Sequence, residues 1–98
     1  KRDTAARYKE FFEEYTGITF FTEPSDSRSN YWLNVVLLDN YDERQKFLEY
    51  TNDHGVMTRP AWQLMNRLEM FKNCETDSLE NTTWLEERIV NIPSSVRL

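Results

Sequence analysis

The sequence predicts one domain of the α+β class, with a small antiparallel sheet packed against helices. Apolar residues recur three and four positions apart near both ends of the chain, which is the spacing of helices. Two β-branched and aromatic runs lie between them, separated by a polar loop. A length of 98 residues suits a single domain. The expected order is helix, strand, strand, helix, strand and helix, without strict alternation.

The first helix is expected over residues 3–16. Asp3 can cap its start, and Gly17 suits the left-handed residue that follows many helices. The side chains of one face recur at spacings of three, four and three: Ala5, Tyr8, Phe12 and Tyr15. This regular face predicts that the helix packs on a core.

Residues 18–22 and 31–38 are expected to form an antiparallel hairpin across the polar loop 23–30. The second strand is apolar on both faces, with Leu33, Val35 and Leu37 on one and Trp32, Val36 and Leu38 on the other. Asn34 interrupts this alternation. A strand that is apolar on both faces is typically covered on both sides or central in its sheet.

A second helix is expected to begin after Asn40, with Glu43 placed as in a capping box, and to end before Gly55. Its inward residues are expected to be Phe47, Leu48 and Thr51. Residues 56–59 should be extended, because the residue before Pro60 is disfavoured in the helical region.

The last third of the chain is expected to hold a helical turn within 63–71 and a helix over 79–91. Pro93 would stop that helix. Its apolar face again shows spacings of three, four and three: Thr82, Leu85, Ile89 and Ile92.

Charge and cysteine content exclude several classes of protein. The net charge is −5 and the pI is about 4.8, which argues against nucleic-acid partners and anionic membrane surfaces. Residues 75–87 contain no Lys or Arg and are expected to be a solvated acidic face. Cys74 and His54 are the only residues of their kinds, so neither an internal disulfide nor a zinc site is expected. A cytoplasmic location is the resulting expectation.

The aromatic content is high for so polar a chain. Phe, Tyr and Trp make up 14% of the residues, whereas the mean hydropathy is −0.78. This combination fits a domain that packs against a neighbour, although a small aromatic core would also account for it. The chain opens on Lys1, and we expect it to be a piece of a longer protein. Part of the first helix or the region of Trp62 should then be exposed.

The candidate binding residues are Arg59, Trp62 and Asn66. A guanidinium can hold a phosphate or carboxylate through two parallel hydrogen bonds, and Pro60 stiffens the backbone beside it. Trp62 offers a face for stacking, and Asn66 offers both a donor and an acceptor. Together they could line a cleft for a phosphorylated, ring-bearing ligand. The alternative is a surface arginine paired with a nearby acid, with Trp62 in the core.

Four segments, in this order, resemble the DegT/DnrJ/EryC1/StrS sugar-nucleotide aminotransferases: KRDTAARYKEFF (1–12), SNYWLNVVLL (29–38), GVMTRPAWQLMNRLEMF (55–71) and NTTWLEERIVNIPSS (81–95). The similarity is closest to the branch that aminates 4-keto-6-deoxy sugars for surface glycans, in the legionaminic-acid and bacillosamine pathways.

The resemblance implies a pyridoxal-phosphate enzyme of aminotransferase fold type I. Residues 1–98 would be its small C-terminal domain, with a linking helix (1–16), a β-hairpin (18–38) and a helix–strand–helices part (40–98). A large N-terminal domain would carry the cofactor, and the enzyme would work as a homodimer. It would transfer an amino group from glutamate to a nucleotide-linked keto-sugar.

The resemblance also assigns roles to residues. In the family, an arginine–proline and aromatic segment is often followed by a Pro-Leu-His element that faces the nucleotide sugar. Arg59 and Trp62 match the arginine and the aromatic, and Asn66 stands at the position of the histidine, so the resemblance implies that these three residues bind the substrate. Asn66 can bind a phosphate or sugar but cannot carry a positive charge. None of the four lysines lies in anything like the family's cofactor motif: Lys1, Lys9, Lys46 and Lys72. The chain alone is therefore expected to bind no cofactor and to be inactive.

Two other functions remain open at this stage. The first is a stand-alone α+β module for ligand binding or dimerisation, since Trp and Arg are also favoured at protein interfaces. The second is an acidic regulatory protein, which the absence of a basic DNA-binding face disfavours.

Overall fold

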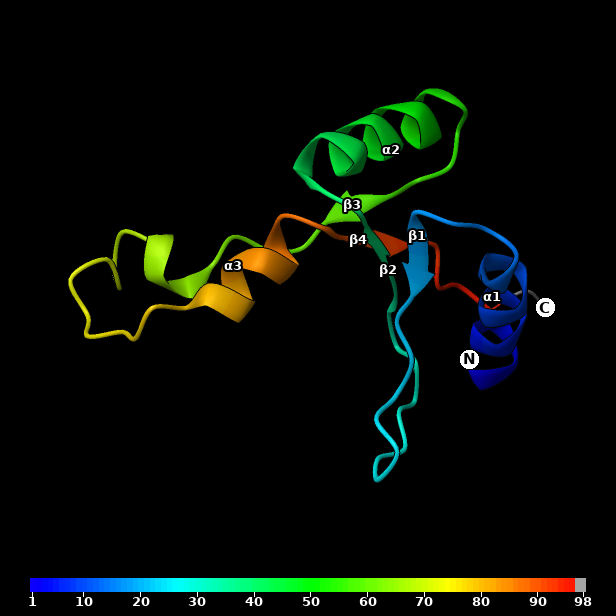
Figure 1. Cartoon of the computed structure of the whole chain (residues 1–98), viewed down its shortest axis with the longest axis horizontal. Helices are drawn as coiled ribbons and strands as arrows, with labels where there is room; N and C mark the ends of the chain where they lie inside the picture. Colours follow the sequence, from blue (N-terminus) through cyan, green and yellow to red (C-terminus); the bar gives the residue numbers. More distant parts are fainter. Residues whose placement is uncertain (97–98) are drawn as a thin grey trace.

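The computed structural model describes residues 1–96, and it confirms the α+β class (Figure 1). The helices and strands along the chain are α1 (Arg2–Glu13), β1 (Ile18–Phe20), β2 (Asn34–Leu38), α2 (Tyr41–Asp53), β3 (Arg59–Pro60), the 3-10 turn η1 (Met65–Arg67), α3 (Glu80–Glu86) and β4 (Ile89–Ile92).

The four strands form one antiparallel sheet in the order β1-β2-β4-β3. β1 pairs with β2, as the hairpin prediction requires, and β2 is central, as its two apolar faces indicate. The second strand is shorter than predicted and begins only at Asn34. Tyr31 has a φ of 49°, a left-handed conformation that cannot belong to an extended strand.

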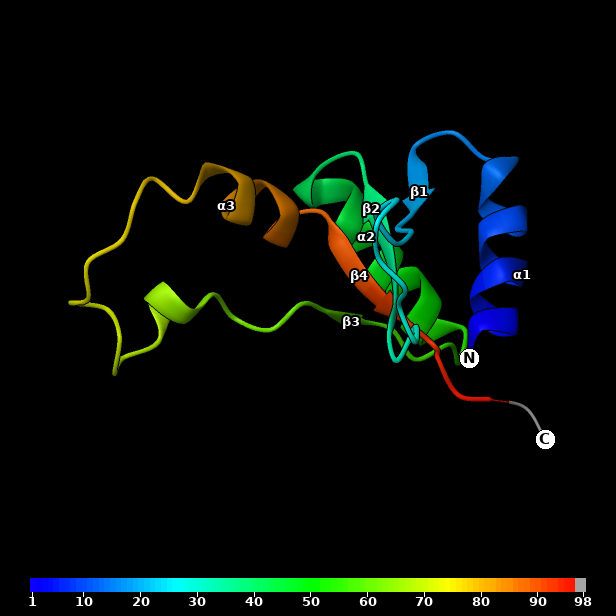
Figure 2. The same ribbon diagram turned by 90° about the horizontal axis from the view of Figure 1, so that it is seen from below.

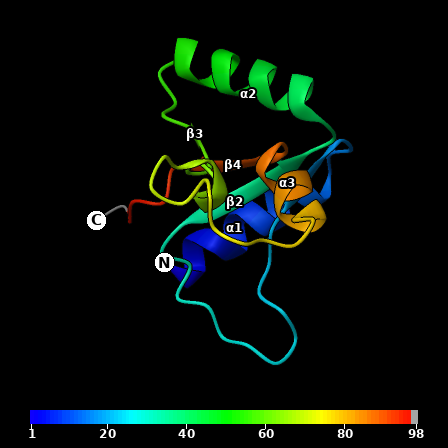
Figure 3. The same cartoon turned by 90° about the vertical axis from the view of Figure 1, so that its left-hand side faces the viewer.

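One face of the sheet carries the core. Asn34, Val36 and Leu38 of β2 are buried, whereas Val35 and Leu37 are half-buried. Aromatic and aliphatic side chains of both long helices pack on this face: Tyr8 and Phe12 from α1, and Phe47 and Leu48 from α2. α1 contacts β1, and α2 contacts β2 and β4. Figure 3 shows both helices beside the strands of the sheet.

The predicted helix over 79–91 is wrong in its second half. α3 ends at Glu86, and Ile89–Ile92 is strand β4, which lies between β2 and β3. The spacing of apolar residues fits a helix, but Val90 and Ile92 also alternate with half-buried neighbours as in a strand. Pairing with β2 on one side and β3 on the other decides in favour of the strand. Pro93 therefore follows a strand and not a helix.

α1 is displaced toward the N-terminus relative to the prediction. It begins at Arg2 and ends at Glu13, and Asp3 lies in its first turn instead of capping it. Tyr15 lies beyond the helix and is 51% exposed, so it does not continue the packed face. Gly17 has the expected positive φ, at 80°. Because the helix ends three residues earlier than predicted, the chain has room to reverse into β1.

α2 agrees closely with its prediction. The Asn40 side chain accepts a hydrogen bond from the Glu43 N–H at 2.9 Å, which satisfies one of the free N–H groups of the first turn. Gly55 follows the helix with a φ of 79°. The unexpected feature is Arg44, whose side chain is 7% exposed although it belongs to the polar part of the helix.

Residues 61–79 form an arm that leaves the sheet after β3 and returns at α3 (Figure 2). The helical turn predicted within 63–71 is present as η1. The acidic run is exposed in the arm, as expected, but Glu86 is only 17% exposed in its side chain. The arm gives the molecule its elongated outline, with extents of 45, 36 and 27 Å.

Residues 1–96 contain no candidate for a membrane-spanning helix or for a metal cluster. None of their helices combines the length and the apolar character that crossing a bilayer requires. No group of three or more His, Cys, Asp or Glu side chains within this range is placed to hold a metal ion.

Candidate functional site

Arg59 lies on β3, at the edge of the sheet, and its side chain is exposed. Its Nη1 donates to the Asn52 side-chain oxygen at 3.2 Å and to the Thr58 carbonyl at 2.9 Å. Within residues 1–96 no carboxylate pairs with Arg59, and its Nη2 and Nε form no hydrogen bond. The guanidinium therefore keeps donors available for an anionic ligand.

The backbone that carries Arg59 is anchored to the end of α2. Thr58 is buried, at 2% exposure, and its hydroxyl lies 2.7 Å from that of Thr51. The Asn52 amide donates to the same hydroxyl at 3.0 Å and to the Thr58 carbonyl at 3.2 Å. Hydrogen bonds from Thr51 and Asn52 of α2 to Thr58 therefore fix the backbone at the start of β3, next to Arg59.

Trp62 is 72% exposed, so the alternative that placed it in the core is wrong. Asn66 lies in η1 and is half-buried. It lines a cavity of about 450 Å³ between the arm and α3, whose other lining residues include Leu64, Phe71 and Cys74. No hydrogen bond or ring contact joins Arg59, Trp62 and Asn66 among the described residues, so they lie along one segment without converging on a closed pocket.

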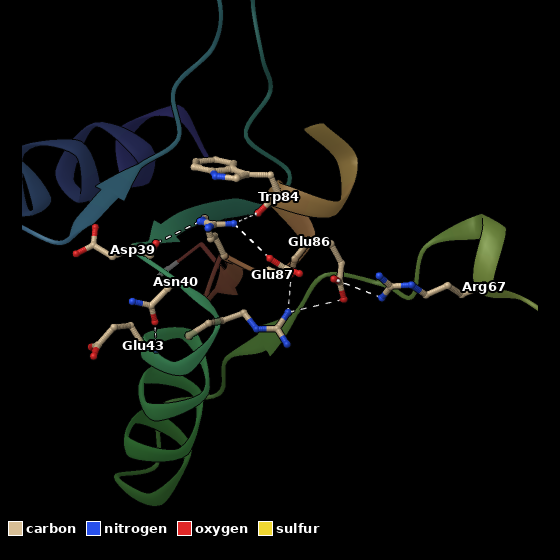
Figure 4. Close-up of polar contacts among 9 residues, drawn as sticks. Asp39, Asn40, Glu43, Arg67, Trp84, Glu86 and Glu87 are labelled. Carbon is tan, nitrogen blue, oxygen red and sulfur yellow. Dashed lines mark hydrogen bonds and ion pairs between the residues drawn. The ribbon is translucent and has the colours of Figure 1, made fainter. Parts of the chain in front are cut away.

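A group of arginines around Glu86 was not predicted from the sequence (Figure 4). Arg44 donates to the Glu86 carbonyl at 2.6 Å, and its guanidinium lies 4.0 Å from the Glu86 carboxylate. Arg67 lies 3.5 Å from the other oxygen of that carboxylate. Glu86 therefore lies between α2 and η1. The sequence held no signal for this arrangement, because the three residues are far apart in the chain and Glu86 belongs to the acidic run.

Arg88 makes a second group beside it. Its guanidinium lies 4.3 Å from the centre of the Trp84 ring and donates to the Trp84 carbonyl at 2.8 Å. Its Nε donates to the Asp39 carbonyl at 3.2 Å. The contact with the Trp84 ring is a cation–π pair. Together with the two hydrogen bonds, it joins α3 to the end of β2.

A third polar group holds the loop 23–30 against α1. Arg2 binds both oxygens of the Glu23 carboxylate, at 3.0 and 2.8 Å, and the Ser29 N–H donates to the same carboxylate. The Arg2 hydrogen bond, followed by that of Ser29, lowers the pKa of Glu23 to about 2. The Arg2 guanidinium also lies 5.6 Å from the centre of the Tyr31 ring.

The lowered pKa of Glu23 predicts a pH-dependent contribution to stability. Its ordinary pKa is 4.5, so the charged form stabilises the folded chain above pH 4.5, and this contribution is lost as the pH falls toward 2. We expect Glu23→Gln to lower the free energy of unfolding at pH 7 and to change it much less near pH 2. Urea unfolding at both pH values checks this, with Glu10→Gln on the exposed side of α1 as the control. An equal loss at both pH values would contradict it.

The lysines of this chain do not form a site for pyridoxal phosphate. All four are exposed; Lys46 and Lys72 pair with Glu43 and Glu69 three residues earlier in sequence, and Lys1 donates to backbone carbonyls. Lys9 borders two surface hollows beside α1, where no aspartate is available to pair with a pyridinium nitrogen.

The fold defines a class: an α+β domain with a four-stranded antiparallel sheet, in which the candidate residue Arg59 lies on an edge strand and Trp62 and Asn66 lie in the arm after it. Residues 1–98 match the family model of the DegT/DnrJ/EryC1/StrS aminotransferase family, so the chain belongs to that family.

Two solved aminotransferases share this fold. One is the aminotransferase TlmJ from Streptoalloteichus hindustanus, with a TM-score of 0.81 and 20% identity over 94% of this chain. The other is PseC from Helicobacter pylori, an aminotransferase involved in the biosynthesis of pseudoaminic acid, with a TM-score of 0.79 and 14% identity over 94% of this chain. The matches cover 24% and 26% of those two proteins, so this chain spans about a quarter of their length.

Proposed function

We propose that this chain is the small C-terminal domain of a pyridoxal-phosphate-dependent aminotransferase. The enzyme transfers an amino group from glutamate to a nucleotide-linked 4-keto-6-deoxy sugar, for surface glycan biosynthesis in the cytoplasm. The observation that carries the proposal is the family match over all 98 residues. The short span of the chain relative to TlmJ and PseC supports a role as one part of a larger enzyme.

Three side chains have the chemistry for the substrate. The free Nη2 and Nε of Arg59 suit a phosphate of the nucleotide, because a guanidinium meets two phosphate oxygens with parallel hydrogen bonds. The exposed Trp62 ring suits stacking on a base or a sugar. Asn66, half-buried at the rim of its cavity, suits a sugar hydroxyl, to which an amide can donate and from which it can accept. Their separation in this chain suits an extended ligand.

The cofactor belongs to the large domain in this proposal. Pyridoxal phosphate supplies the electron sink for amino transfer, and the lysines of this chain do not fit it. The role of this chain is to bind and orient the nucleotide sugar. It also excludes water from the sugar when the small and large domains meet. A homodimer is the assembly that goes with this proposal.

A stand-alone module for ligand binding or dimerisation is the second candidate. The observation that favours it is the exposure of large apolar side chains in the arm, where Met70 is 76%, Trp62 72% and Met65 64% exposed. Large exposed apolar side chains are typical of protein interfaces as well as of ligand sites. This candidate requires the 98 residues to dimerise or to bind a nucleotide sugar without further protein.

A cofactor titration separates the two candidates. We expect the 98-residue chain, mixed with pyridoxal phosphate, to show no absorbance band of lysine-bound cofactor after gel filtration. The complete gene product, treated in the same way, should retain the cofactor in a stable band. A stable band on the 98-residue chain would contradict the assignment of the cofactor to another domain. No band on the complete gene product would contradict the aminotransferase itself.

A further inference from the structure

The arm is held to the rest of the molecule by very few polar contacts. Among residues 1–96, its hydrogen bonds join arm residues to one another, as from Arg67 to Leu64 and from Cys74 to Phe71. The exception is the bond from the Thr83 N–H to the Leu79 carbonyl, which begins α3. Of the ion pairs within residues 1–96, only that between Arg67 and Glu86 reaches from the arm to another element. The position of η1 therefore depends on this pair and on apolar packing.

Glu86 is fixed from the opposite side by α2. Arg44 is 7% exposed in its side chain and lies 4.8 Å from the centre of the Tyr41 ring. It donates to the Glu86 carbonyl, one of the last carbonyls of α3, which has no partner within its own helix. Two positive guanidinium groups thus lie near the carbonyl end of α3, where the helix dipole favours positive charge. The hydrogen bond from the buried Arg44 fixes the backbone at Glu86, and its positive charge lies near the carboxylate.

We propose that Glu86 is a positioning residue that sets the place of Asn66 by holding its neighbour Arg67. The chain of contacts runs from the buried Arg44 through Glu86 to Arg67, and so from the core to η1 (Figure 4). Asn66 and Arg67 belong to the same 3-10 turn, so a shift of Arg67 moves Asn66 and the rim of its cavity with it. The effect on substrate rests on the proposed function, whereas the effect on the arm does not.

The pair can be broken at its exposed end without disturbing the core. Arg67 is 45% exposed in its side chain, so Arg67→Gln leaves Arg44 and Glu86 in place. Lys72→Gln is the matched control, because it removes the same charge from the same arm but breaks only the local pair with Glu69. Arg67→Lys keeps the charge and should restore part of the effect.

The test measures two quantities on the complete gene product. Hydrogen exchange of peptides covering residues 64–71 should become about two- to fivefold faster in Arg67→Gln, the factor that corresponds to the loss of an exposed ion pair. KM for the nucleotide sugar should rise by about the same factor with little change in kcat, because substrate binding depends on where Asn66 lies. Lys72→Gln should change neither quantity, and Arg67→Lys should fall between native and Arg67→Gln.

The outcomes separate the positioning role from the proposed function. Faster exchange with unchanged KM would uphold the positioning of η1 and contradict the role of Asn66 in substrate binding. Exchange equal to that of the native protein would overturn the proposal, whatever the kinetics show. So would equal effects of Arg67→Gln and Lys72→Gln, since loss of charge in the arm would then be sufficient.

Discussion

Arg59→Ala is expected to raise KM for the nucleotide sugar by about ten- to a hundredfold in the complete gene product, with a smaller change in kcat. A charge-assisted hydrogen bond contributes about 1.5–3 kcal/mol, which corresponds to that factor. The guanidinium is exposed and keeps Nη2 and Nε free, so the loss should fall on ligand binding. Steady-state kinetics with varied nucleotide sugar measures it, and thermal unfolding of the same variant reports the fold.

Two variants make the result specific. Arg7→Ala removes an exposed arginine of α1 and should leave KM unchanged. Arg59→Lys keeps the charge but loses the planar fork, so its KM should lie between those of the native protein and Arg59→Ala. If Arg59→Ala lowers Tm and leaves KM unchanged, Arg59 serves to brace β3 through Asn52 and Thr58 and does not bind the ligand.

Val90→Ala is expected to lower the free energy of unfolding by about 2–3 kcal/mol. Val90 has 0% exposure, and in the sheet it lies between Val36 of β2 and Pro60 of β3. The substitution removes two buried methyl groups and leaves a cavity at the centre of the core. Urea unfolding followed by tryptophan fluorescence or circular dichroism measures the loss.

This variant also distinguishes the strand from the helix that the sequence predicts over 79–91. In an exposed helix, alanine is more favourable than valine by a few tenths of a kcal/mol, so stability would rise. Leu85→Ala is the control within α3, where the side chain is 36% exposed and the cost should be smaller than at Val90. An unchanged or raised stability of Val90→Ala would contradict the placement of β4 in the core.

Local rules predicted the first half of the fold well. The Asn40 cap, the positive φ at Gly17 and Gly55, and the pairing of β1 with β2 all follow from residues close in sequence. Such features depend on backbone geometry within a few residues, which composition and spacing describe directly. The central place of β2 followed from its two apolar faces.

The second half depends on contacts between distant residues. Thr82, Leu85, Ile89 and Ile92 satisfy the spacing of a helix, but Ile89–Ile92 pairs with β2, more than fifty positions earlier, and with β3. Tertiary pairing of this kind overrides a local pattern, and a single sequence does not reveal it. Residues 56–59 were expected to be extended. The strand that forms there, β3, covers Arg59–Pro60, because pairing with β4 sets its position.

The candidate site could be predicted in part from the types of residue in the sequence. Arg59, Trp62 and Asn66 were chosen because their side chains suit a phosphorylated ring-bearing ligand. The structure leaves Arg59 and Trp62 exposed and Asn66 half-buried, without joining them in one pocket. The role of Glu86 was hidden, because an acidic run is usually a solvated face. Only the folded arrangement brings Arg44 and Arg67 to the same carboxylate.

Amino transfer by the complete gene product tests the proposed function most directly. Native protein is incubated with glutamate, pyridoxal phosphate and a UDP-linked 4-keto-6-deoxy sugar, and formation of the 4-amino sugar and of 2-oxoglutarate is followed together. The proposal predicts the two products in equal amounts, and no product from the 98-residue chain alone. Absence of transfer from native protein with every nucleotide-linked keto-sugar tried would contradict the assigned substrate.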